Sequence, residues 1–113
     1  MLAAIDAGSN TLRLLLGQVS GGKVVPEFYE RRICRLAGGF SKEEGLSLEA
    51  RERTLFAFQE FADICQKLNV EQVRAVGTAA FRQAINGNAF ALRVRETTML
   101  PLEIISGDAE AGT

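Results

Sequence analysis

The chain has 113 residues, 47% hydrophobic and 24% charged, with 13 basic and 14 acidic side chains and no histidine. This composition is typical of one globular domain, and it excludes a mainly electrostatic nucleic-acid binder and His-based catalysis or metal sites. No apolar run is long enough to cross a membrane and no signal-peptide layout opens the chain, so we expect a cytoplasmic protein. Cys34 and Cys65 have no metal-ligand spacing, and we expect two free thiols.

An apolar strand, a turn of small residues and a second apolar strand open the predicted fold. Asp6 ends the first strand, and Gly8 allows the turn to approach a ligand closely. Ser9, Asn10 and Thr11 add side-chain donors, and successive turn N–H groups can form an anion-binding nest. Because a carboxylate repels a phosphate, Asp6 would need a divalent cation between them. The pattern predicts a phosphate-and-metal turn, with an ordinary hairpin as the alternative.

A third strand is predicted over residues 23–34, with Ser20-Gly21-Gly22 as the hairpin turn before it and Pro26 as a sign of an edge strand. A long helix follows, capped by Ser47 and ended by Asn69. Its buried stripe is expected to comprise the apolar residues that recur every three or four positions, Leu48, Leu55, Phe58, Phe61, Ala62, Cys65 and Leu68.

The remaining predicted elements are, in chain order, a strand over 72–77, a helix over 79–85, a helix around 90–98 and a strand over 102–105. Thr78 is expected to cap the first of these helices, and Asn86-Gly87 to stop it. Arg82 lies near the start of that helix, where the helix dipole disfavours a cation. It therefore either awaits an anion or is an ordinary exposed arginine.

These elements predict an α/β fold with a five-stranded mixed sheet, in which three antiparallel strands precede parallel crossovers, flanked by helices. The crossovers should be right-handed, and ligands should meet the carboxyl ends of the strands. Asp6, Thr78, Arg82 and residues 106–110 all fall at such ends. This convergence favours a phosphate site over an ordinary hairpin.

Four blocks of the sequence resemble a known family, in order and at similar spacing. They are Ala4-Ile5-Asp6-Ala7-Gly8-Ser9-Asn10-Thr11, Arg35-Leu36-Ala37-Gly38-Gly39, residues 76–84 (VGTAAFRQA) and residues 104–111 (IISGDAEA). The chain resembles the exopolyphosphatase/guanosine pentaphosphate phosphatase (Ppx/GppA) family over essentially its whole length. The first block alone would indicate only the wider superfamily of actin-like ATPases, sugar kinases and Hsp70. The resemblance implies an actin-like ATPase (ribonuclease H-like) fold of two domains with the active site between them. Residues 1–113 would then be a single N-terminal domain whose second domain is missing.

The resemblance also implies magnesium-assisted hydrolysis of the terminal phosphoryl group of polyphosphate or guanosine pentaphosphate. On this basis Asp6 would hold the metal, and Glu110 would be the base that prepares the attacking water. The residues implied to bind phosphate are Gly8, Ser9, Asn10, Thr11 and Arg82. Since phosphoryl transfer mainly needs positioning and charge neutralisation, this division of roles is chemically sensible.

Three positions depart from the family pattern. Ala7 replaces a larger aliphatic residue, Ala109 stands where a second acidic residue is common beside the base, and Gly112 replaces a larger residue. Two other functions stay open, a non-catalytic regulator that binds phosphate or nucleotide and an ATPase or kinase of the actin-like superfamily. The choice between the two phosphatase substrates and the formation of a homodimer also stay open.

Overall fold

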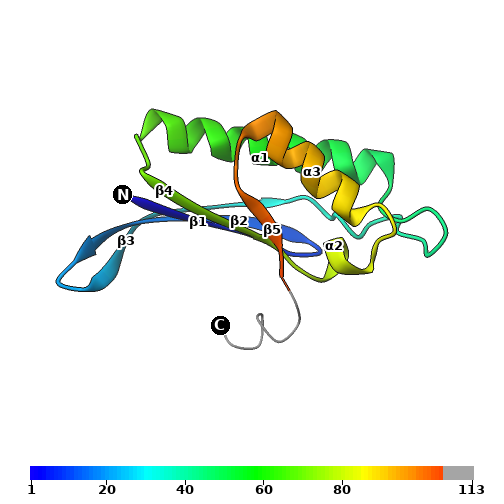
Figure 1. The fold of residues 1–113 in the computed structure, drawn as a ribbon, viewed down its shortest axis with the longest axis horizontal. Coiled ribbons are helices and arrows are strands. Elements are labelled where there is room, and N and C mark those ends of the chain that lie inside the picture. Colours follow the sequence, from blue (N-terminus) through cyan, green and yellow to red (C-terminus); the bar gives the residue numbers. More distant parts are fainter. Residues whose placement is uncertain (106–113) are drawn as a thin grey trace.

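The computed structural model describes residues 1–105, which form one mixed sheet and three helices (Figure 1). The strands are β1 (Leu2–Ala7), β2 (Thr11–Ser20), β3 (Lys23–Ile33), β4 (Gln72–Gly77) and β5 (Leu102–Ile104). The helices are α1 (Leu48–Lys67), α2 (Ala79–Gln83) and α3 (Gly87–Thr98). The order in the sheet is β3-β2-β1-β4-β5, with β1, β2 and β3 antiparallel neighbours and β4 and β5 parallel to β1. The predicted five-stranded mixed sheet is confirmed.

The β2–β3 hairpin has the turn that the sequence predicts. Gly21 and Gly22 both have positive φ, 59° and 79°, which glycine adopts without steric cost and which suits the twist of a hairpin. β3 is an edge strand, as Pro26 indicates. The register of the β2–β3 pair shifts by one residue beside Pro26: Leu16 pairs with Phe28, but the next residue, Gly17, pairs with Pro26.

Helix α1 begins as predicted, since Ser47 Oγ accepts a hydrogen bond from the Ala50 N–H at 3.2 Å. It ends at Lys67, and Asn69, just past the C-cap, has the left-handed conformation expected of it (φ 53°). The predicted stripe is wrong at its two ends, where Leu48 is 60% exposed and Leu68 is 45% exposed. Leu48 is the first helical residue and Leu68 is the C-cap, so the buried stripe runs only from Ala50 to Cys65.

Helix α2 is shorter than predicted and ends at Gln83 rather than Ile85. The helix stops there because the backbone of Ala84 is extended (ψ 136°). The chain then passes so close to α2 that a Cβ atom at Gly87 would clash with the carbonyl oxygen of Phe81. Asn86 and Gly87 therefore begin α3 rather than only stopping α2. Thr78 is the N-cap residue, but its hydroxyl donates to the Ala7 carbonyl at 3.2 Å instead of capping the helix.

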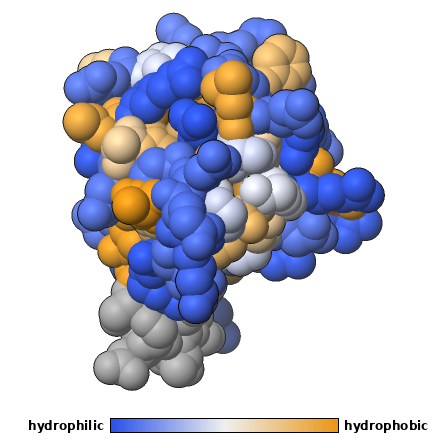
Figure 2. All heavy atoms as spheres, turned by 90° about the vertical axis from the view of Figure 1, so that its right-hand side faces the viewer, coloured by the Kyte–Doolittle hydropathy of each residue, from blue (hydrophilic) through white to orange (hydrophobic). Residues whose placement is uncertain are grey.

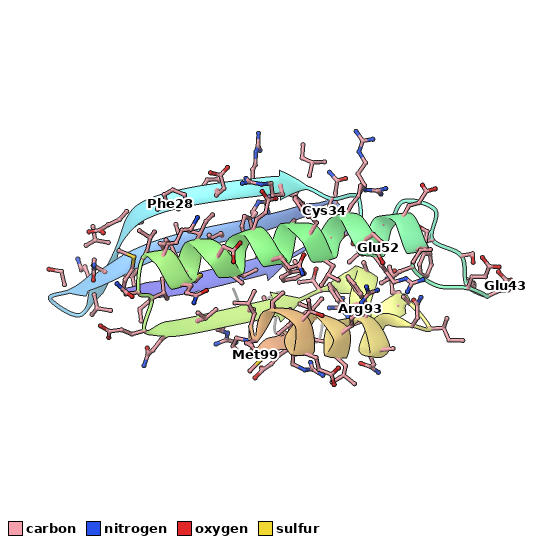
Figure 3. The ribbon with its side chains drawn as sticks, turned by 90° about the horizontal axis from the view of Figure 1, so that it is seen from above. Phe28, Cys34, Glu43, Glu52, Arg93 and Met99 are labelled. Carbon is pink, nitrogen blue, oxygen red and sulfur yellow. The ribbon has the colours of Figure 1, made fainter. Side chains whose placement is uncertain are left out.

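Helices α1 and α3 lie over the same face of the sheet (Figure 1). Their facing side chains Glu52 and Arg93 point toward one another and form an ion pair at 3.2 Å (Figure 3). Alternate strand residues are buried beneath the helices: Ala3, Ile5, Ala7, Leu12, Leu14, Leu16, Ala75 and Leu102. Because β1 buries these alternate residues, Asp6 projects from the opposite face. Within residues 1–105, no helix has the length and apolar character that crossing a membrane requires.

Candidate functional site

The carboxyl ends of the parallel strands β1, β4 and β5 meet at one edge of the sheet. In the strand register Ala7 pairs with Gly77, and Gly77 with Ile104, so the chain leaves all three strands side by side. A cavity of about 500 Å³ lies at this edge, lined by Ala4, Ile5, Asp6, Gly8, Arg74, Val76, Thr78 and Ile105. The structure thus brings Asp6, Gly8 and Thr78 to one cavity. Figure 2 faces this end of the molecule, whose visible surface is mostly hydrophilic.

The turn at residues 8–11 is held by backbone hydrogen bonds on its inner and outer sides. Within the turn, the Gly8 N–H donates to the Thr11 carbonyl at 3.1 Å. The carbonyls of Ser9 and Asn10 instead accept bonds from residues 34–37. In a trans peptide the C=O and the following N–H point in opposite directions, so the N–H groups of Asn10 and Thr11 point away from that segment. The carbonyls of Ser9, Asn10 and Thr11 are thus engaged, and the N–H groups of Asn10 and Thr11 are directed away from residues 34–37, as in turns whose successive N–H groups bind an anion.

The segment that holds this turn, residues 34–38, overlaps the second block of the family resemblance, residues 35–39. Cys34 and Leu36 anchor it in the core, at 4% and 1% exposure. Arg35 between them has φ 51°, a left-handed conformation that is uncommon for a residue with a Cβ. Burial raises the pKa of the Cys34 thiol, which keeps it neutral beside the turn. Cys34 and Cys65 are both free and buried, as expected.

Asp6 lies in a row of side chains that crosses the sheet on its face opposite the helices. The register aligns Arg31, Arg13, Asp6, Val76 and Glu103, one from each strand. Arg13 is therefore the cross-strand neighbour of Asp6, and Arg31 lies beyond it. Arg13 belongs to no motif of the sequence, although the register of the β1–β2 hairpin places it opposite Asp6.

Arg82 does not line the cavity but lies at the same end of the sheet. Its Nη1 donates to the carbonyl of Ile105 at 2.8 Å, which joins α2 to the residue after β5. Ile105 also donates its N–H to the Gly77 carbonyl at 3.0 Å, so the chain stays paired with β4 up to this point. The base implied by the resemblance, Glu110, and the departures Ala109 and Gly112 lie outside the described residues.

One carboxylate near the cavity could contribute to the binding of a metal ion. Among residues 1–105, Asp6 is the one acidic side chain that lines the cavity, and no group of three His, Cys, Asp or Glu residues could hold a metal. Magnesium is usually bound through one or two carboxylates together with substrate phosphates and water. Asp6 is exposed at the strand end, so its carboxylate can act in this way.

Three antiparallel strands followed by parallel crossovers, with a turn of small residues after the first strand, define a domain of the actin-like ATPase (ribonuclease H-like) fold. A model of the Ppx/GppA phosphatase family matches residues 17–113. The chain belongs to this family.

Solved structures extend the likeness to the first turn, which the family model leaves out. A Ppx/GppA family member from Aquifex aeolicus is similar with a TM-score of 0.90 and 31% sequence identity, covering 96% of this chain. An exopolyphosphatase from Cytophaga hutchinsonii gives a TM-score of 0.92 and 27% identity, covering 98% of this chain. The chain spans 36% of the length of each of these two proteins.

Proposed function

We propose that this chain forms one wall of the active site of a phosphatase that hydrolyses the terminal phosphoryl group of inorganic polyphosphate or guanosine pentaphosphate. The observation that carries the proposal is the cavity where Asp6, Gly8 and Thr78 meet at the carboxyl ends of β1 and β4. Membership of the Ppx/GppA phosphatase family supports it, as does the similarity to an exopolyphosphatase. Ligands of open α/β sheets bind at this edge.

Each proposed role follows from the chemistry of phosphoryl transfer, which depends on positioning and on neutralising charge. The turn formed by Gly8, Ser9, Asn10 and Thr11 would bind phosphate oxygens through N–H and hydroxyl donors. Asp6 would hold a magnesium ion, which supplies positive charge to the phosphates when bound. Arg13, opposite Asp6 in the sheet, adds a fixed positive charge near the same edge.

Two roles come from the family resemblance. Arg82, in the last turn of the short helix α2, would contact a substrate phosphate next to the carboxyl end of β5. Glu110 would accept a proton from the attacking water. We propose Glu110 for this role because Asp6 is committed to the metal and has a shorter side chain.

A complete site needs donors on more than one side of the transferred group. Because the chain spans 36% of the length of its relatives, we propose that a second domain supplies the opposite wall and that the activity belongs to the complete protein. We expect the isolated chain to be inactive. Magnesium-dependent phosphate release by the purified chain alone would contradict this expectation.

The test is phosphate release by the complete protein from polyphosphate and, separately, from guanosine pentaphosphate, with and without magnesium. Asp6→Asn keeps the side-chain size and removes the charge, and it should lower kcat by about 10²-fold or more. Glu110→Gln should lower kcat by roughly 10²- to 10⁴-fold with little change in substrate affinity. The matched control is Asp63→Asn, an exposed carboxylate on α1, which should leave kcat unchanged. Binding of either substrate without turnover would refute the phosphatase and favour a regulator.

A further inference from the structure

We infer that Arg53 of α1 is a positioning residue for the 8–11 turn and acts on it through residues 34–38. The inference rests on the proposed function only for the identity of the ligand that the turn binds. The hydrogen bonds that connect α1 to the turn do not depend on that function. Arg53 carries no role in the family resemblance, and it binds carbonyls of residues 34–38, whereas N–H groups of the same segment bind the turn.

The first step of the coupling joins α1 to the segment. Arg53 Nε donates to the Cys34 carbonyl at 3.0 Å, and Nη2 donates to the Arg35 carbonyl at 3.3 Å. One guanidinium thus holds two successive carbonyls of the backbone. Its planar fork suits this arrangement, whereas the single ammonium of a lysine does not. Figure 3 shows Cys34 beside α1 at the end of β3.

The second step joins the segment to the turn. The N–H groups of Cys34 and Arg35 both donate to the Asn10 carbonyl at 2.9 Å, and the Ala37 N–H donates to the Ser9 carbonyl at 3.0 Å. Three backbone bonds therefore set the position of two successive peptides in the turn.

The two steps share peptide groups, so they reinforce each other. The Cys34 carbonyl, which accepts from Arg53, belongs to the same peptide as the Arg35 N–H, which donates to Asn10. The Asn10 carbonyl in turn belongs to the same peptide as the Thr11 N–H. A cation at one end of such a chain polarises each peptide and strengthens the donor at the other end. That last donor is the N–H of Thr11, in the proposed phosphate turn.

The backbone of Arg35 explains why this segment needs an external hold. Its φ of 51° is unfavourable for a residue with a Cβ, and such conformations persist only where the surroundings impose them. The Gly38 N–H also donates to the Arg35 carbonyl at 2.9 Å, so that carbonyl accepts two bonds. Without the guanidinium, the segment keeps the strain and loses two of its bonds.

The test compares Arg53→Met with Arg51→Met. Arg51 is a matched control on the same helix, because its Nε also donates to a backbone carbonyl, that of Leu46, at 3.3 Å. The first measurement is amide hydrogen exchange in the chain itself. We expect the N–H groups of Cys34, Arg35 and Ala37 to exchange about tenfold faster in Arg53→Met than in the control, with β1 and β4 unchanged.

The second measurement is kinetics of the complete protein on polyphosphate. Arg53→Met should lower kcat/KM by roughly 10- to 100-fold, the typical effect of a misplaced binding group, and Arg53→Lys should recover part of the loss. Arg51→Met should leave kcat/KM near wild type. If Arg53 served stability alone, Arg53→Lys would recover kcat/KM only as far as it recovers the melting temperature.

Unchanged exchange at residues 34–37 in Arg53→Met would overturn the coupling, as would equal losses of kcat/KM in the two methionine variants. Should Arg53→Met fail to fold, the same comparison is made with Arg53→Lys, which keeps one carbonyl contact. Faster exchange together with a wild-type protein that hydrolyses neither substrate would support the coupling and refute the proposed function, so the two failures can be told apart.

Discussion

The side chain of Asn86 joins two loops that are far apart in the sequence, and its removal should destabilise the fold. Its Oδ1 accepts from the Leu46 N–H at 2.8 Å, and its Nδ2 donates to the Leu46 carbonyl at 3.1 Å. The side-chain amide of Asn86 therefore satisfies both the backbone N–H and the backbone carbonyl of Leu46, a residue that is only 1% exposed. Asn86 makes no capping bond to α3, so its contribution lies in this contact.

Asn86→Ala removes both bonds but leaves the two Leu46 groups in unequal positions. The carbonyl keeps a bond from Arg51 Nε at 3.3 Å, whereas the N–H loses its partner. A buried donor without a partner costs about 1–3 kcal/mol, so we expect the free energy of unfolding to fall by about 2 kcal/mol. At roughly 4 °C per kcal/mol for a domain of this size, the melting temperature should fall by about 8 °C. Urea unfolding and calorimetry of the chain measure the two quantities.

Asn88→Ala is the matched control, since Asn88 is exposed on the first turn of α3. Alanine favours a helix more than asparagine does, so this change should be neutral or stabilise the chain by a few tenths of a kcal/mol. Equal stability of the Asn86→Ala and Asn88→Ala variants would refute the reasoning, because it would mean that water or a small shift replaces the amide at no cost.

Two further predictions concern packing and pH. Gly77→Ala places a Cβ 2.7 Å from the ring of Phe81, which stacks on Phe90 with ring centroids 5.7 Å apart, so the free energy of unfolding should fall by about 1–3 kcal/mol. In the double variant with Phe81→Leu, the loss of stability should be smaller than the sum of the two single losses. Losses that add fully in urea unfolding would contradict the clash. Burial raises the pKa of Cys34 and Cys65 above the ordinary 9.0, so the folded state holds their protons longer than the unfolded state. The free energy of unfolding is therefore unaffected by the thiols below their pKa in the unfolded state, and it falls as the pH rises from that value toward their pKa in the folded state. Between pH 8 and pH 10, the wild type should lose more stability than a double Cys→Ala variant. Equal losses in the two proteins would refute this prediction.

Elements whose cause lies within a few residues could be predicted from the sequence. The Gly21-Gly22 turn, the Ser47 cap and the left-handed Asn69 each follow from local backbone preferences, and the structure confirms them. The antiparallel pairing of β1, β2 and β3 followed as well, because short turns join these strands, whereas the place of β4 beside β1 is known from the structure alone.

Features set by contacts between distant segments could not be predicted in the same way. The Thr78 hydroxyl had a local partner available in α2, yet it bonds to Ala7 across the parallel strand pair. Helix α2 ends early because Gly87 packs on the Phe81 backbone, which depends on where α3 lies. In each case a tertiary contact outweighed the local preference.

The candidate site divides in the same way. That Asp6 and Thr78 lie at one edge was predictable, since parallel strands bring their carboxyl ends together whatever their side chains. The hydrogen bonds that hold the 8–11 turn were not, because no local pattern connects Ser9 and Asn10 to residues 34–37. The second block of the resemblance, residues 35–39, contains no side chain that lines the cavity. Its backbone N–H groups nevertheless help to set the position of the turn. A motif without catalytic side chains can therefore belong to a site through its backbone, and its dependence on α1 is visible only in three dimensions.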